Sequence, residues 1–215
     1  MAIPSGYRPD GASARLLALS ERLASRLGRV SVGDLLDGLG RSALGVGLMV
    51  PALLALIPLP GPFGIAFGAV IGVIALQVLS GRTRLGLPRF LRERQLPAGP
   101  VAIAIRRFAV PLRWAERLSR PRRLLPLTGR VARVALGGPL LLLALALSLP
   151  IPLGNALPAI ALTVFAIGFM ERDGLAILVA LGVSIVALVW TAMLILFGAH
   201  ILDWLWTITR LNQMF

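Results

Sequence analysis

The sequence predicts an all-α integral membrane protein, and three observations support this class. The 215 residues are 57% hydrophobic and only 14% charged, whereas soluble domains are roughly 45–50% apolar. Two uncharged blocks, 42–81 and 134–170, are each interrupted near the middle by a Pro-x-Pro sequence. A third uncharged segment, 175–199, has no interruption. We therefore expect one membrane domain, 1–215, in which two broken helical hairpins precede a transmembrane helix.

The charged residues indicate the kind of partner. All 22 basic residues are arginine, and 9 acidic residues leave a formal charge of +13. Beside such apolar blocks, this charge predicts contact with a bilayer of anionic headgroups and not with nucleic acid. The chain has no cysteine and one histidine, His200, so neither a disulfide framework nor a metal centre is expected. No cofactor is expected either.

The first element is an amphipathic helix over 13–30, in which leucines form one stripe and arginines border it. One interpretation places this helix on the membrane surface, with Arg22 and Arg26 close to lipid phosphates. The other packs it on the protein's own cytoplasmic surface. In the glycine-rich approach that follows, Ser31 or Asp34 can cap a helix start.

The first hairpin is expected over 42–81. Its arms, 42–57 and 63–80, hold 16 and 18 residues, or ~24–27 Å of helix, less than the ~30 Å hydrocarbon core. Glycines suited to close helix packing occur at Gly45, Gly47, Gly64, Gly68 and Gly72. The tip residues are Pro58, Pro60, Gly61 and Pro62. Short arms favour a re-entrant tip, and the alternative is an external loop in a thinned bilayer.

The second half repeats this order. A proline-rich linker over 83–102 precedes an amphipathic helix over 103–120, which carries the headgroup candidates Arg113 and Arg117. The second hairpin covers 134–170, with Pro150, Pro152, Gly154 and Asn155 at its tip. The segment 175–199 is the one unbroken stretch long enough to cross alone.

These similarities predict an internal repeat, with one unit at 13–82 and another at 103–174. Four arginines with spacings of 7, 4 and 3 residues recur at an offset of 91: Arg15, Arg22, Arg26 and Arg29 match Arg106, Arg113, Arg117 and Arg120. The two Pro-x-Pro sequences recur at an offset of 92. Repeats with broken helices are a common way to build a transporter site at mid-membrane depth.

Arginine placement predicts the orientation in a bacterial inner membrane. The first 41 residues hold 6 arginines and the segment 82–133 holds 14, so both are expected in the cytoplasm. Each hairpin then enters and leaves on the cytoplasmic side, and the C-terminus lies in the periplasm. Because one such chain buries little surface, a homodimer is expected.

Polar residues near the blocks are the remaining site candidates. They are Gln77, Arg82, Asn155, Glu171, Arg172 and Asp173. Asp173 can simply cap the last helix, with Glu171 and Arg172 in a solvated turn; the alternative is an ion-pair network with the central arginines or a functional site. Asn155 can cap or turn the chain or make a functional contact, and Gln77 can serve helix packing or contact a substrate. No carboxylate lies inside either block, which argues against a proton-coupled transporter. No set of catalytic residues is present, so the chain is not expected to be an enzyme.

Several stretches resemble the ExoD family of bacterial exopolysaccharide-synthesis membrane proteins. The most specific are the ALQVLSGR sequence at 75–82 and the GFMERDG sequence at 168–174, beside PALLALIPLPGP at 51–62, LPRFL at 87–91 and GNALPA at 154–159. The similarity covers about 32–196. Family members tend to carry an aromatic residue where this chain has Gly86. The resemblance implies an inner-membrane protein linked to exopolysaccharide production.

Two functions remain open at this point. The first is a non-enzymatic scaffold or small transporter for exopolysaccharide synthesis or export, with hairpin tips that meet in the membrane. The alternative is a translocase that moves lipid-linked polyprenyl-phosphate intermediates or other anionic lipids between leaflets, with arginines gathering their headgroups.

Overall fold

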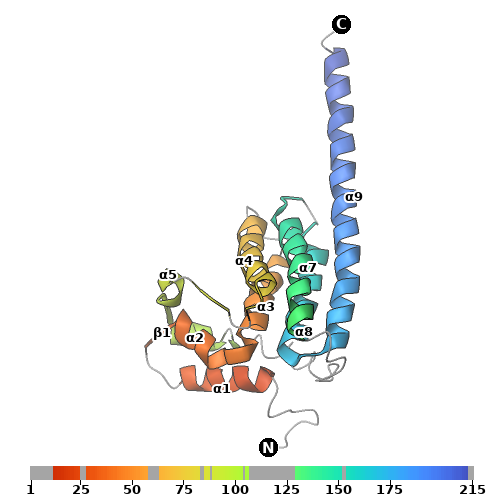
Figure 1. Ribbon diagram of the computed structural model, residues 1–215. Helices are drawn as coiled ribbons and strands as arrows, with labels where there is room; N and C mark the ends of the chain where they lie inside the picture. The colour runs from red at the N-terminus through yellow and green to blue at the C-terminus, as the bar shows by residue number, and fades with distance from the viewer. Residues whose placement is uncertain are drawn as a thin grey trace, which may run out of the picture.

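The computed structural model describes residues 12–24, 28–57, 63–82, 85–87, 89–103, 105–106, 129–151 and 154–212. Within these ranges the fold is mostly helical, as predicted. Four apolar helices form a bundle: α3 (Ala43–Ala55), α4 (Phe63–Leu79), α7 (Arg130–Ser148) and α8 (Ala156–Glu171). A fifth helix, α9 (Gly174–Asn212), packs along one side of the bundle and continues far beyond it (Figure 1).

The direction of the four helices places both predicted tips at one end of the bundle. The end of α3, the start of α4, the end of α7 and the start of α8 all lie at that end (Figure 1). The turn between α8 and α9 and the helix α1 (Ala12–Ala24) lie at the opposite end, which we call the base. Both predicted hairpins therefore point the same way.

Helices of different hairpins pack more closely than the two arms of one hairpin. Among the four helices of the hairpins, the most extensive contacts join α4 to α7 and α3 to α8, whereas α3–α4 and α7–α8 share less surface. The core between them is apolar, and its largest fully buried side chains include Leu48, Ile71, Leu140, Leu162 and Phe165. The bundle is therefore held together chiefly by contacts between its two halves.

The structure contains a small two-stranded sheet, which the all-α prediction did not include. Strand β1 (Arg29–Ser31) pairs antiparallel with β2 (Gln95–Pro97), with Val30 opposite Leu96. The predicted helix over 13–30 is therefore too long, because α1 ends at Ala24 and the chain is extended at Arg29. Val30 is buried against Ala98 and Ala102, and this burial favours the strand over a continued helix.

The predicted linker is more ordered than expected. It contains α5 (Arg89–Arg92) and β2, and helix continues over residues 98–103, which start earlier than the predicted 103–120 helix. Arg92 forms a 2.6 Å ion pair with Asp37 on α2 (Val32–Leu39). The Oγ of Ser31 caps α2 by accepting the N–H of Asp34 at 3.0 Å, which confirms one of the two predicted caps.

The helix α1 packs on the protein itself. Ala14 and Leu16 are buried, and Leu19 reaches Gly38 on α2. Figure 1 shows α1 lying across the base, roughly at right angles to the bundle. Its apolar side therefore serves the protein's own core, which agrees with the second interpretation of this helix and not with burial of that side in lipid.

Two helices within the described residues are long and apolar enough to cross a membrane: Val131–Ser148 of α7 and Gly174–His200 of α9. The prediction of a single such segment was wrong, because α7 begins at Arg130, four residues before the predicted block. The predicted transmembrane segment 175–199 matches the apolar span Gly174–His200, and the helix itself continues to Asn212. The α4 and α8 helices are apolar but shorter.

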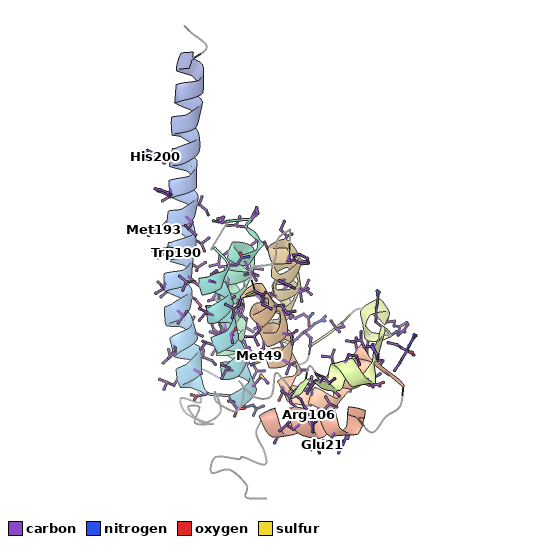
Figure 2. All side chains as sticks on the ribbon, turned by 180° about the vertical axis from the view of Figure 1, so that it is seen from behind. Glu21, Met49, Arg106, Trp190, Met193 and His200 are labelled. Carbon is purple, nitrogen blue, oxygen red and sulfur yellow. The ribbon has the colours of Figure 1, made fainter. Side chains whose placement is uncertain are left out.

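Helix α9 packs on the bundle along only part of its length. Its buried residues recur every three or four positions, from Gly174 and Ile177 through Ala187 to Thr191. Between 192 and 200 no residue is buried, and His200 lies on the projecting part of the helix (Figure 2). Small residues thus hold α9 to α8 and α7, and its second half projects beyond them.

Candidate functional site

The start of α4 crosses the end of α7 close to Asn155. A Cβ atom at Gly64 would lie 2.8 Å from the carbonyl oxygen of Leu147 and 3.0 Å from Nδ2 of Asn155. Only glycine allows this approach, because any larger residue would strike the backbone of α7. The structure thus brings Asn155 of the second hairpin beside Gly64 of the first.

Proline removes hydrogen-bond donors at the end of α7. The helical donor for the Ala146 carbonyl would be the N–H of residue 150, and that for Ser148 would be the N–H of residue 152. Both positions are proline, which has no N–H. The Ala146 carbonyl accepts the N–H of Leu149 at 3.3 Å instead, and the N–H of Ile151 donates to the carbonyl of Leu149 at 2.8 Å. The two prolines thus end the regular helical hydrogen bonds of α7, and shorter-range bonds replace them in part.

Asn155 adds a further acceptor to the tip. Its Oδ1 atom is buried and has no hydrogen-bond partner, and it is the one side-chain atom of this kind in the described part of the chain. Leaving such a group unsatisfied costs roughly 1–3 kcal/mol. Asn155 precedes α8 but makes no side-chain cap to it. The simple capping interpretation of Asn155 is therefore not what the structure contains.

The first arms of the two hairpins correspond at an offset of 92. The stretches 41–45 and 133–137 share arginine, alanine, leucine and glycine in the same order, RSALG and RVALG. Leu48 and Leu140 are both buried, as are Ala52 and Ala144. The first-arm residues that face the core thus occupy matching positions.

The second arms correspond at an offset of 91. Gly81 and Arg172 are equivalent and both have positive φ, at 74° and 53°. In each half, the backbone N–H of the following residue makes the last hydrogen bond of the helix. The N–H of Arg82 donates to the Gln77 carbonyl at 3.0 Å, and the N–H of Asp173 donates to the Gly168 carbonyl at 3.1 Å. This is the same helix-ending hydrogen bond in both halves. The tip of the second hairpin is therefore one residue shorter.

Contacts between the halves follow the same correspondence. A Cβ on Gly45 of α3 would meet the side chain of Met170 and lie 2.8 Å from the Ala166 carbonyl on α8. At the equivalent Gly137 of α7, a Cβ would lie 2.7 Å from the backbone nitrogen of Leu79 on α4. Met170 and Leu79 are themselves equivalent at an offset of 91. Exchanging the two hairpins therefore preserves these contacts.

The base carries a compact charged cluster, composed of Arg133, Glu171, Arg172 and Asp173. Glu171 and Asp173 are 7% and 3% exposed, and Arg133 lies within electrostatic range of Arg172. One carboxylate oxygen of Asp173 accepts the N–H of Leu175 at 2.9 Å. The predicted cap at Asp173 is confirmed. Arg133 was not among the predicted site residues. The sequence does contain a signal for it, because an arginine stands two residues before an Ala-Leu-Gly sequence both at Arg41 and at Arg133.

Replacement of Asp173 by alanine is expected to destabilise the start of α9. The substitution removes the cap and leaves a buried position without its carboxylate, at a cost of about 1–2 kcal/mol from the cap alone. The measurement is the melting temperature of the purified protein in detergent. Asp173→Ser, which restores a capping oxygen without the charge, should melt between the two. Equal melting of Asp173→Ala and the natural chain would contradict this role.

Gln77 fixes the segment that follows α4. Its Nε2 donates to the Gly86 carbonyl at 2.8 Å, and its Oε1 accepts the Gly86 N–H at 2.7 Å. A side chain at residue 86 would crowd Arg82, since a Cβ there lies 3.1 Å from Nη1 of that arginine. Gln77 therefore acts as a structural clamp on the segment after α4, a contact that was not among the predicted ones.

A Gln77→Leu variant should lose both hydrogen bonds to Gly86. Because each leaves a partly buried backbone group without its partner, the combined cost is about 2 kcal/mol. Thermal unfolding measures the effect. Ser80→Ala provides the control, since the Ser80 hydroxyl is exposed and bonds only its own helix at Leu76. A drop in melting temperature as large for Ser80→Ala would count against the clamp.

Several predicted site residues lie outside the described residues. These are Pro58, Pro60, Gly61, Pro62, Pro152, Arg26, Arg113 and Arg117. Of the others, Pro150, Arg22 and Arg82 are exposed, and Gly154 is buried. The structure thus gathers Asn155 and Gly154 at the tips and Glu171, Arg172 and Asp173 at the base.

Comparison with known proteins identifies the family. The profile described as "Exopolysaccharide synthesis, ExoD" matches residues 13–193. Protein ExoD of Rhizobium meliloti is 31% identical over 139 residues, which cover 60% of this chain and 56% of that protein. Uncharacterized protein slr1875 of Synechocystis sp. is 27% identical over 132 residues, 61% of this chain and 62% of that protein.

The matches to both relatives span about three fifths of their length. No solved structure matches the chain. The resemblance seen in the ALQVLSGR and GFMERDG sequences is thereby confirmed, because the profile covers both. The chain belongs to the ExoD family of exopolysaccharide-synthesis proteins.

Proposed function

We propose that this protein is a non-enzymatic inner-membrane component of exopolysaccharide synthesis or export, and that it works as a small transporter built from a duplicated unit. Each unit contributes one broken hairpin. The observation that carries the proposal is the close approach of Gly64, at the start of α4, to Leu147 and Asn155 of the second hairpin. Matched burial, matched glycine contacts and matched helix endings support the duplication.

The length of α9 supports re-entrant hairpins. If Asp203 and the tryptophans after it mark the outer membrane boundary, the 12 residues from Thr191 to Asp203 rise about 18 Å. Half of the hydrocarbon core is about 15 Å. Because the bundle stops covering α9 at Thr191, the tips then lie near the middle of the membrane. The outer half is crossed by α9 alone.

Irregular backbone at that depth needs protein or water to satisfy it. The proline-rich tips reduce this need on the donor side, since proline has no N–H. In transporters with broken helices, backbone of this kind lines the site at mid-membrane depth. We further propose that two copies associate in the membrane, because the bundle leaves residues 192–200 of α9 uncovered and the small residues Gly198 and Ala199 there allow a second helix to pack closely.

The test is restoration of exopolysaccharide secretion in a bacterium from which this gene has been deleted. We expect the natural chain to restore secretion and Asn155→Leu to reduce it strongly at equal membrane abundance. Thr163→Ala is the matched control on the same helix, since its hydroxyl bonds only its own backbone at Ala159. Full secretion with Asn155→Leu would contradict a transport role for the tips.

Liposomes distinguish the translocase alternative. Reconstituted protein that moves a fluorescent polyprenyl phosphate between leaflets would favour that function. Failure to do so, combined with restored secretion in cells, would favour the transporter or scaffold.

A further inference from the structure

We propose that the short helix α5 and the residues that join it to β2 form a surface that binds the anionic phospholipid headgroups of the cytoplasmic leaflet. Two features of the described residues carry this inference. The first is the level of α5 beside the apolar bundle, and the second is the set of exposed arginines on and around it. The inference rests on the proposed depth of the hairpin tips, which fixes where the membrane surface crosses the bundle.

The level of α5 corresponds to the membrane surface. Figure 1 shows α5 to one side of the bundle, between the level of α1 and the level of the tips. The 17 residues of α4 rise about 24 Å, and with the tips at the middle of the membrane about 15 Å of this lies in hydrocarbon. The remaining ~9 Å crosses a headgroup layer that is about 5–8 Å thick in each leaflet. An element beside this end of the bundle therefore lies among the headgroups.

Helix α5 is held on the protein from the side of α2. Arg92 pairs with Asp37 on α2 at 2.6 Å, and its side chain lies against Gly33, where a Cβ would come within 2.6 Å of Cγ of Arg92. Just beyond α5, the carbonyl of Arg94 accepts the N–H of Val32 at 3.0 Å. One arginine side chain and the main chain thus fix the position of α5.

The exposed charges around α5 favour anionic lipid. Within the described residues 28–40 and 89–97, and apart from the Arg92–Asp37 pair, the exposed charged residues are Arg29, Arg89, Arg94, Asp34 and Glu93. Asp34 lies in the first turn of α2, where a carboxylate is stabilised by the helix dipole. The balance of charge is positive, and guanidinium groups match the geometry of phosphate. This surface therefore suits phosphatidylglycerol better than a zwitterionic lipid.

The long side chains of Arg89 and Arg94 are also suited to this level. Arginine can lay its apolar stem along the acyl-chain boundary while its guanidinium stays among the phosphates. Each arginine close to an anionic membrane surface contributes about 1 kcal/mol of attraction. The α1, α2 and sheet layer is then attached to the bilayer at two places, the bundle and α5, and anionic lipid is enriched at the second.

The experiment uses the full chain in lipid nanodiscs that contain phosphatidylglycerol and phosphatidylcholine in equal amounts. Glu93→Cys carries a bimane fluorophore at the proposed surface, and the chain has no other cysteine. Glu21→Cys is the matched control, because it removes the same charge from an exposed site on α1, at the end of the molecule away from the tips (Figure 2). In separate samples, one of the two lipids carries a nitroxide quencher near the top of its acyl chain.

We expect both lipids to quench the fluorophore of Glu93→Cys, and phosphatidylglycerol to quench it more. A local enrichment of about fivefold corresponds to the ~1 kcal/mol that one arginine supplies at an anionic surface. Adding Arg89→Gln and Arg94→Gln to Glu93→Cys should bring quenching by the two lipids close to equality. The fluorophore of Glu21→Cys should be quenched weakly, and equally by both lipids.

Two results would overturn the proposal. One is quenching of Glu93→Cys as weak as that of Glu21→Cys, which would place α5 in water and leave its arginines to a soluble acidic partner. The other is equal quenching by the two lipids, or a preference for phosphatidylglycerol that survives the loss of Arg89 and Arg94. Tip depth is measured separately: tips that prove accessible from the periplasm, beside a quenched fluorophore at Glu93→Cys, would refute re-entrant tips and leave this surface standing.

Discussion

A Gly68→Ala substitution is expected to prevent the protein from folding stably, although alanine normally favours a helix. A Cβ at Gly68 would collide with Oγ of Ser148 and lie 2.6 Å from the Ala144 carbonyl. The carbonyl belongs to the backbone of α7 and cannot rotate away, so the two helices must separate. Since α4 and α7 share the most extensive contact in the bundle, we expect a loss above about 4 kcal/mol.

The control for this variant is Gly72→Ala, one turn along the same helix. The nearest atom to a Cβ there is Cβ of Ala144 at 3.9 Å, an ordinary contact. Alanine should stabilise the helix at this position by roughly 0.5–1 kcal/mol. Melting temperature and yield in detergent report both effects. Similar melting of the two variants would show that α4 does not approach α7 at Gly68 as described.

Alanine at Gly45 and at Gly137 should destabilise the protein to a similar extent. Gly45 faces the Ala166 carbonyl at 2.8 Å, and Gly137 faces the Leu79 nitrogen at 2.7 Å. Each would-be Cβ lies closer than real Cβ contacts allow, so backbone must shift at both crossings. We expect about 2–4 kcal/mol for each variant, in the range of severe overpacking.

Gly138→Ala is a stringent control, because it adjoins Gly137 and has no atom within 4 Å of its would-be Cβ. It should melt at or above the temperature of the natural chain. A large loss for Gly45→Ala with none for Gly137→Ala would separate the two crossings and argue against the duplicated unit. Equal losses would support it.

The sequence was sufficient to locate the apolar helices, because absence of charge over a long stretch has few structural outcomes. The helix breaks at the Pro-x-Pro sequences could also be predicted, because Pro58 and Pro150 have no N–H to continue the hydrogen bonds of the helices before them. The ends of the helices could not be predicted as well. The helix α7 continues through Pro139, and it begins at Arg130, where hydropathy alone gives no sign of a helix start.

The sheet could not be anticipated from local pattern. The stretch Arg29–Ser31 continues a helical leucine stripe, and its extended form depends on pairing with Gln95–Pro97, more than sixty residues away. The same limit applies to α1. An amphipathic stripe indicates that Leu16 will be buried, but not whether lipid or protein covers it.

Site prediction divided in a similar way. The capping role of Asp173 follows from its position before an apolar helix, so the sequence suffices. The proximity of Asn155 to Gly64 depends on how the two hairpins cross, and a single sequence does not indicate this crossing. The importance of Gly137 and Arg133 becomes visible only when the RSALG and RVALG stretches are aligned, a recurrence weaker than that of the prolines.

Cysteine accessibility is the measurement that tests the central claim, two hairpins that enter from the cytoplasm and end inside the membrane. The chain has no cysteine, so a single introduced one reports alone. Ile57→Cys and Ile151→Cys probe the two tips, Arg172→Cys probes the base and Asn212→Cys probes the end of α9. A bulky membrane-impermeant maleimide is applied to right-side-out and inside-out vesicles.

The account predicts labelling of Arg172→Cys only from the cytoplasmic side and of Asn212→Cys only from the periplasmic side. Both tip cysteines should resist the reagent from either side, and both should react after detergent is added. Labelling of either tip from the cytoplasmic side, or of both tips from the periplasm as readily as Asn212→Cys, would contradict re-entrant hairpins whose tips meet near the membrane centre.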